Sequence, residues 1–171
     1  MDYVILSAAT RGSRYEHCIR KQRKLFKDHR YLGLIVDDRG KWAENTKIKP
    51  DAVRRGFDEC PVVLWVDSDC TIDPPDTAPA GDWDICTMRN IHPRHKIKIS
   101  AGFILFRDTK PTREFLYSWD KHNKTAKKDH PAMIHALHDM RGRLHVSDMT
   151  QWLAGRHAIN SLAPERGVFA G

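Results

Sequence analysis

Two aspartates at the end of an apolar run are the residues with the clearest chemistry in this sequence. Asp67 and Asp69 directly follow Val62–Val66, in the stretch VVLWVDSDCTIDPP. A carboxylate beside buried residues is costly to desolvate unless it meets a cation or hydrogen-bond donors. Residues i and i+2 of a strand project to the same side, about 7 Å apart at most, so both side chains can face one cation. Such oxygen ligands suit Mg²⁺ or Mn²⁺, which completes its shell with waters and phosphates, so the pair predicts a metal-bound phosphate ester.

The elements that must position this pair are buried strands alternating with helices. Continuous apolar runs occur at residues 3–7, 32–36 and 62–66, and such runs are typical of a parallel sheet covered on both faces. Helical patterns separate them, the second at residues 50–59 before Pro61. The order β-α-β-α-β predicts an α/β fold with a Rossmann-like, mostly parallel sheet and helices on both faces. Ligands of such sheets bind beyond the carboxyl ends of the strands, which is where the aspartates stand.

The first helix has a clear start and a clear apolar face. Ser13-x-x-Glu16 has the form of a capping box. Six residues then share one face at helical spacing, and among them only Gln22 is polar. They are Tyr15, Cys18, Ile19, Gln22, Leu25 and Phe26. The basic residues between them are expected to point outward.

Later elements are expected in the second half of the chain. Residues 82–88 and 99–107 read as strands, the latter with a glycine, Gly102, where backbone or ligand can approach closely. Residues 112–122 and 129–140 read as helices, the second ending at a glycine. A strand is expected near residues 144–147, followed by an irregular tail.

Length, composition and charge limit the class of protein. The 171 residues suffice for a single domain spanning 1–171, and 40% hydrophobic with 30% charged residues is a globular composition. There is no apolar run long enough for a membrane span and no recognisable leader, so we expect a soluble, cytoplasmic protein without a membrane partner. The four cysteines lack zinc or disulfide spacing. The net charge of +7, concentrated in residues 20–30, 94–98 and 121–128, favours polyanionic partners.

With these residues in view, the sequence resembles the nucleotide-sugar glycosyltransferases of GT-A fold, whose metal-binding D-x-D motif follows an apolar strand. Further landmarks occur in order between residue 3 and about residue 140. They are Lys49-Pro50, Trp83-Asp84-Ile85 ahead of Arg89, the stretch SAGFILFR at residues 100–107, Trp119, and Asp129-His130-Pro131-Ala132. The resemblance implies a GT-A domain that transfers a sugar from a nucleoside diphosphate sugar with Mn²⁺ or Mg²⁺ as cofactor.

The resemblance also implies roles for individual residues. Asp69 would bind the metal directly, and Asp67 would contact both the metal and the ribose. A histidine from the C-terminal region would be a further ligand, with His157 the first candidate and His145 the second. The remaining donor-binding candidates are Thr10, Arg11, Asp37, Asp38, Lys49, Arg89 and Gly102.

The expected reaction leaves a nucleoside diphosphate with extra negative charge. A divalent ion and a basic group such as Arg11 or Arg89 would stabilise that charge. If the sugar's configuration inverts, a carboxylate base is needed, and Asp129 is the catalytic candidate. Many family members have Asp-Gln where this chain has Asp129-His130. If the configuration is retained, no dedicated base can be named.

Other interpretations of the same residues stay open. DSDCTI also fits the motif of haloacid-dehalogenase-like phosphatases, with Asp67 as nucleophile and Asp69 as acid, although that family has the motif at its first strand and needs a later acidic motif. The aspartates could merely cap a turn. Asp129 could be a helix N-cap, and Arg89 could pair with a nearby aspartate. His157 could be a surface histidine.

The acceptor is the least determined part of the hypothesis. A basic domain of this size is compatible with a nucleic-acid acceptor, for instance a hydroxymethylated base in phage-modified DNA. Such a base would have to be flipped out of the duplex or approached at its groove edge. A basic nucleic-acid binding module without chemistry is a further alternative. The base and sugar of the donor and the oligomeric state do not follow from the sequence.

Overall fold

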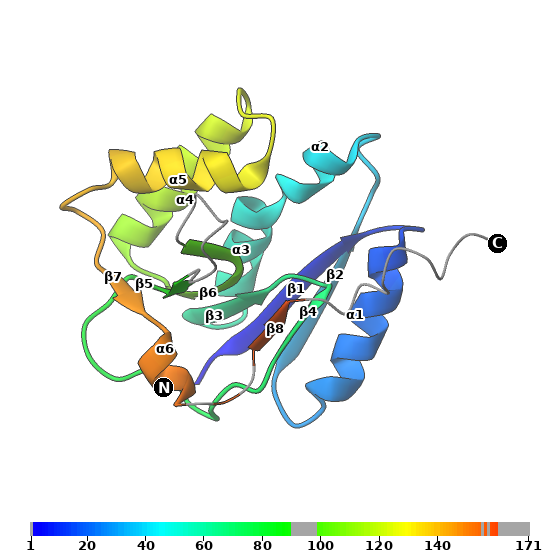
Figure 1. The fold of residues 1–171 in the computed structure, drawn as a ribbon, viewed down its shortest axis with the longest axis horizontal. Coiled ribbons are helices and arrows are strands. Elements are labelled where there is room, and N and C mark those ends of the chain that lie inside the picture. The colour runs from blue at the N-terminus through cyan, green and yellow to red at the C-terminus, as the bar shows by residue number, and fades with distance from the viewer. Residues whose placement is uncertain (1, 90–98, 155, 157, 161–171) are drawn as a thin grey trace.

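A six-stranded sheet organises the described part of the chain, which comprises residues 2–89, 99–154, 156 and 158–160 of this computed structural model (Figure 1). The strand order is β2-β1-β3-β6-β5-β7. The strands are β1 (Val4–Thr10), β2 (Tyr31–Val36), β3 (Val62–Val66), β5 (Ile85–Arg89), β6 (Ile99–Arg107) and β7 (Val146–Asp148). Only β6 runs antiparallel to its neighbours, β3 and β5, while the other pairs are parallel. The α/β class with a mostly parallel sheet is confirmed.

Helices cover both faces of this sheet, as predicted. One face packs against α3 (Lys49–Phe57), α4 (Lys110–Asn123) and α5 (Asp129–Asp139). The other face packs against residues around α1 (Arg14–Leu25) and α6 (Thr150–Leu153), so the two groups of helices lie on opposite sides in Figure 1. The helices in the described residues include none that is both long and apolar enough to cross a membrane.

Alternation along the strands divides the core into two layers. In β3, Val63 and Trp65 join the layer under α3, α4 and α5, whereas Leu64 and Val66 join the opposite layer. The same alternation separates the even and odd residues of β1. Because successive side chains of a strand point to opposite faces, a strand buried on both sides has to be apolar throughout. This is why the sequence shows continuous apolar runs.

The first helix begins where predicted, but the hydrogen bond at its start differs from that of a capping box. Ser13 is the N-cap residue, yet its side chain makes no cap hydrogen bond, and Glu16 accepts from the backbone N–H of Gly12 at 2.8 Å. The capping-box prediction was therefore wrong in its contacts. The predicted apolar face is also narrower than expected, because the side chain of Leu25, in the last turn, is 56% exposed.

Several short elements were not predicted. They are α2 (Trp42–Thr46), α6 and a separate two-stranded sheet of β4 (Cys70–Ile72) with β8 (Ala158–Asn160). Two predicted strands are shifted toward the C-terminus, so that β5 begins at Ile85 and β7 at Val146. Asp84 explains the first shift, because its carboxylate accepts hydrogen bonds from Thr109 Oγ1 and the His145 N–H and so serves as a cap rather than a strand residue.

Helix α3 lies unusually close to the sheet through a glycine. A Cβ atom added to Gly56 would stand 2.9 Å from Val63 Cγ2 and 3.2 Å from Leu6 Cδ2. The first distance is shorter than a van der Waals contact between carbon atoms. Glycine at this position therefore sets the separation between α3 and the central strands.

The topology brings one set of strand ends together. Strands β1, β2, β3 and β5 run toward the same edge of the sheet, and β6 enters from that edge because it is antiparallel. The residues that follow β3, including Asp67 and Asp69, therefore stand beside the beginning of β6. Helix α5 contributes its first turn to the same region.

Candidate active site

A pocket of about 750 Å³ opens at this edge of the sheet. Its walls come from the end of β1, the turn after β3, the first residues of β6, the loops around α2, and the beginnings of α1, α3 and α5. Seven of the predicted site residues line it: Thr10, Asp38, Lys49, Asp67, Asp69, Gly102 and Asp129. Residues from widely separated parts of the sequence thus meet in one place.

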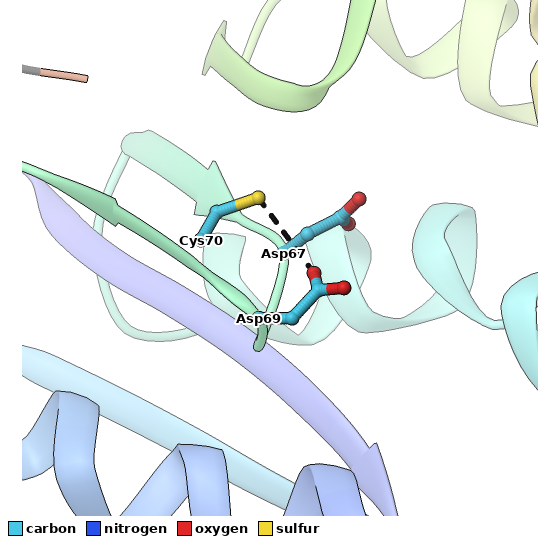
Figure 2. Close-up of side chains that lie close together, drawn as sticks. All are labelled: Asp67, Asp69 and Cys70. Atoms are coloured by element: carbon cyan, nitrogen blue, oxygen red, sulfur yellow. Dashed lines mark hydrogen bonds between the residues drawn. The ribbon is translucent and has the colours of Figure 1, made fainter. Parts of the chain in front are cut away.

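The two aspartates lie in a tight turn and face the same way. The backbone N–H of Cys70 donates to the carbonyl of Asp67 at 2.8 Å, and the N–H of Asp67 donates to the carbonyl of Gly102 at 2.9 Å. Figure 2 shows both carboxylates directed to one side of this turn. Side-chain ligand atoms of Asp67, Asp69 and Cys70 all lie within 4.8 Å of one another. One cation can therefore be shared by the two carboxylates.

The chemistry of these three side chains favours a hard divalent ion. Burial, together with the charges of Asp67 and Asp69, raises the pKa of the Cys70 thiol, so without a metal the thiol keeps its proton. The Cys70 sulfur lies 3.7 Å from Asp69 Oδ1 (Figure 2). Two carboxylates supply the oxygen ligands that suit Mg²⁺ or Mn²⁺.

The two histidines proposed as further ligands have different outcomes. His157 lies outside the described residues. His145 precedes Val146, which pairs with Ile85 at the end of the sheet where β3 begins. Asp67 lies about 16 Å further along β3, given the rise per strand residue. His145 instead stands 3.7 Å from Asp82, so the structure does not bring it to the aspartates.

A buried lysine links the metal-binding turn to helix α5. The Lys49 ammonium lies 2.9 Å from Asp67 Oδ1, 3.0 Å from Asp129 Oδ2 and 3.1 Å from the Ala101 carbonyl oxygen. Its side chain is only 9% exposed. Burial alone would lower the pKa of Lys49, but the two carboxylates outweigh that effect and raise it, so the ammonium is charged. Lys49 therefore lines the pocket with its charge already balanced by protein groups, and its role in donor binding stays a prediction.

Asp129 is the first residue of α5 rather than its N-cap. The cap position belongs to Lys128, whose side chain makes no cap hydrogen bond, so the capping interpretation of Asp129 is not supported. The Asp129 carboxylate is buried. Its Oδ2 forms an ion pair with Lys49, but the two atoms do not have the geometry of a hydrogen bond. The indole N–H of Trp119 donates to the Asp129 carbonyl at 3.1 Å and fixes the backbone there.

His130 stands in the pocket wall beside Asp129. Its Nε2 lies 2.9 Å from the carbonyl oxygen of Ile99. Because a carbonyl can only accept, Nε2 carries the proton of the neutral ring. Burial is the largest cause that lowers the pKa of His130. The imidazole is therefore neutral at physiological pH.

We predict that the pKa of His130 lies below its ordinary value of 6.5. As the pH falls below 6.5, the unfolded chain binds a proton before the folded chain does, so stability decreases in that window. Imidazole shifts followed by NMR through a pH titration would measure the pKa. A pKa at or above 6.5 would contradict the prediction.

The remaining candidates lie at or near the rim. Asp38 Oδ1 accepts from the Gly40 N–H and from Asn45 Nδ2, each at 2.9 Å, and this network closes the loop after β2. Arg11 and Asp37 are exposed and pair at 3.4 Å without lining the pocket. Arg89 ends β5 at the same edge, about 10 Å across the sheet from β3. Its side chain is not among those described.

Sequence reasoning missed two residues that hold the turn. Trp65 donates its indole N–H to Asp67 Oδ1 at 2.7 Å, and the i, i+2 spacing within the strand was the available signal. Gln22 donates to backbone carbonyls of the same turn. Its signal was a polar side chain on an otherwise apolar helix face.

No protein-family model and no curated protein matches this sequence. Solved structures do match. A glycosyltransferase involved in the glycosylation of the major capsid of PBCV-1 superposes with a TM-score of 0.65 at 14% identity, over 87% of this chain and 83% of that chain. The glycosyltransferase GlyE of Streptococcus pneumoniae TIGR4 has a TM-score of 0.50 at 12% identity, over 88% of this chain but 46% of that chain. At these identities the likeness concerns the fold: the chain has the α/β fold found in these glycosyltransferases.

Proposed function

We propose that this protein is a metal-dependent glycosyltransferase that moves a sugar from a nucleoside diphosphate sugar to an acceptor hydroxyl. The observation that carries the proposal is the position of Asp67 and Asp69, whose carboxylates face one side of a turn at a 750 Å³ pocket. The fold shared with the PBCV-1 capsid glycosyltransferase supports the same class of reaction. A pocket of this volume is within the range of small-molecule sites.

Asp67 and Asp69 would hold Mn²⁺ or Mg²⁺. The bound ion supplies positive charge where the diphosphate leaving group becomes more negative. Lys49 stabilises the carboxylates of Asp67 and Asp129 in the pocket wall, as its distances of 2.9 and 3.0 Å require. Asp129 remains our candidate for the base that accepts the proton of the acceptor hydroxyl in an inverting reaction.

The donor would lie between the ends of β1 and β2 and the aspartate turn. Thr10 and Asp38 line this part of the pocket, and Gly102 lines the opposite wall. Arg11, beside the rim, and Arg89, at the end of β5, are the basic residues proposed to meet the diphosphate. The positions of these residues come from the structure, and the roles proposed for them come from the resemblance to glycosyltransferases.

For the acceptor we retain a polyanion such as DNA with a hydroxymethylated base. The exposed face of α1 and the turn that follows it support this choice, because they carry Arg20, Lys21, Arg23, Lys24 and Lys27. The PBCV-1 enzyme takes part in glycosylation of a capsid, so a protein acceptor is the alternative. Mass spectrometry of modified-base DNA after incubation with donor should show a hexose or pentose increment, and no increment would remove the DNA proposal.

A screen of nucleotides and nucleotide sugars with Mn²⁺ tests the reaction class. A donor that binds only the folded state raises stability by about 2.7 kcal/mol at 100 times its dissociation constant, so a clear rise in melting temperature is expected and chelator should abolish it. The same donor should then be turned over. A full panel showing neither binding nor turnover contradicts the proposal.

Other assays separate the alternatives. A phosphatase with Asp67 as nucleophile would release phosphate from a generic aryl phosphate and form an adduct with beryllofluoride. A nucleic-acid binding module would bind DNA with steep salt dependence, and that binding would survive Asp67→Ala and Asp69→Ala.

A further inference from the structure

Gln22 is a buried amide in the middle of helix α1, on the side that faces the sheet. Its side chain has no exposed surface, and its neighbours on that side, Cys18, Ile19 and Phe26, are buried apolar residues. An amide in such surroundings is costly unless each of its polar atoms has a partner. The hydrogen-bond partners of Gln22 therefore indicate its structural role.

Both hydrogens of the Gln22 amide are directed at the aspartate turn. Nε2 donates to the carbonyl of Asp67 at 2.9 Å and to the carbonyl of Cys70 at 2.7 Å. These are the first and last residues of the turn that contains Asp69, and the same Asp67 carbonyl accepts the Cys70 N–H. One side chain on α1 thus fixes both ends of the turn that presents the two carboxylates.

The orientation of this amide is itself fixed. The Tyr31 hydroxyl donates to Gln22 Oε1 at 3.1 Å. Burial raises the pKa of Tyr31 to about 12, so the phenol keeps the proton that it donates. An oxygen facing a donor leaves the amide nitrogen facing the carbonyls. Ser7 adds a further hold, because its Oγ donates to the carbonyl of Val66, the residue before the turn, at 2.6 Å.

We propose that Gln22 is a positioning residue that holds the Asp67–Cys70 turn in the shape that binds the metal. Its contacts are to backbone carbonyls only, so it acts on the metal through the turn. The effect of Gln22 on metal binding rests on the proposed function, whereas its hydrogen bonds to the turn do not depend on it. Residues that orient metal ligands typically change metal affinity by about 10–100-fold when replaced.

Mn²⁺ titration of the whole protein tests the proposal, with free Mn²⁺ followed by electron paramagnetic resonance. Gln22→Leu keeps the size of the side chain and removes all three hydrogen bonds, and it should weaken Mn²⁺ binding about tenfold or more. Tyr31→Phe removes the contact that orients the amide and should have a smaller effect in the same direction. An Mn²⁺ affinity within twofold of wild type in Gln22→Leu would overturn the proposal.

A matched control separates positioning from general loss of stability. Thr112 is fully buried and donates from Oγ1 to the Asp84 carbonyl at 3.2 Å, at the opposite end of the sheet from the pocket. Thr112→Val removes this hydroxyl, which also lies 2.9 Å from Thr109 Oγ1, and should leave Mn²⁺ affinity unchanged. Equal losses of affinity in Thr112→Val and Gln22→Leu would also overturn the proposal.

Hydrogen exchange without metal distinguishes failure of this inference from failure of the proposed function. Gln22→Leu should speed exchange of the amides of residues 67–70, and Thr112→Val should not. If wild type binds no Mn²⁺, the metal-dependent function is wrong, and the exchange rates alone decide whether Gln22 holds the turn. Unchanged exchange in Gln22→Leu contradicts that hold.

Discussion

Replacing Lys49 with methionine is expected to destabilise the protein by about 3–5 kcal/mol, because removing one partner of a buried ion pair leaves an uncompensated charge. The Lys49 ammonium lies 3.0 Å from Asp129, whose side chain is 9% exposed, and 2.9 Å from Asp67. Methionine keeps the packing of the aliphatic stem, so the loss reports mainly on the charge. Urea unfolding should show a lower midpoint with an unchanged slope.

Lys47→Met is a matched control for this variant. Lys47 pairs with Glu44 at 2.7 Å, but the Glu44 side chain is 46% exposed, so its carboxylate remains hydrated when the lysine is lost. The expected cost is below about 1 kcal/mol. Adding Asp129→Asn to Lys49→Met should recover part of the loss, because it removes one of the two stranded charges. Equal costs for Lys47→Met and Lys49→Met would show that the ion pairs of Lys49 contribute little.

Replacing Asp69 with asparagine is expected to reduce sugar transfer by about 100-fold or more without unfolding the protein. A metal ion contributes several kcal/mol of charge stabilisation, and each 1.36 kcal/mol corresponds to about tenfold in rate. The Asp69 side chain is partly exposed and accepts a weak hydrogen bond from the Cys70 thiol, so the free energy of unfolding should change by about 0.5 kcal/mol or less. Initial rates over a panel of UDP- and GDP-sugars with Mn²⁺ measure the first effect.

The control is a second acid on the segment that follows the turn. Asp73 is exposed and lies 3.7 Å from Arg156, outside the pocket lining. Asp73→Asn should keep both Mn²⁺ affinity and rate. Transfer by Asp69→Asn at the wild-type rate, in a preparation that still loses activity with chelator, would move the metal site elsewhere.

The fold followed from the sequence wherever a residue's type was decided by burial. Strands β1, β3 and β6 were recognisable because both of their faces are covered, which favours apolar side chains, and the edge strand β2 was recognisable although its residues are only half-buried. Strand direction was not recognisable, because an antiparallel strand buried on both sides has the same pattern as a parallel one. Helix α2 and strands β4 and β8 span only 5, 3 and 3 residues, too few for a period to appear. A single domain over residues 1–171 remains a prediction.

The gathering of candidate residues around one pocket was predictable, whereas the contacts among them were not, and their functional roles stay predictions. Asp67 and Asp69 stood out because two carboxylates followed a buried strand. The ion pairs of Lys49 join residues 18 and 80 positions away, and such pairings depend on how α3 and α5 pack rather than on any local pattern. Gln22 was visible as a polar residue on an apolar face, but its partners are carbonyls, which every residue has.

The close contact at Gly56 has a consequence for the pocket. Helix α3 carries Lys49 in its first turn, about 10 Å along the helix axis from Gly56. Because Gly56 has no side chain, α3 packs closely against Val63 and Leu6. This packing distance determines how far the Lys49 ammonium reaches toward the carboxylates. The distances between the charged groups of the pocket therefore depend on how the helix packs on the sheet. Substitutions in the core can change these distances without altering any residue that lines the pocket.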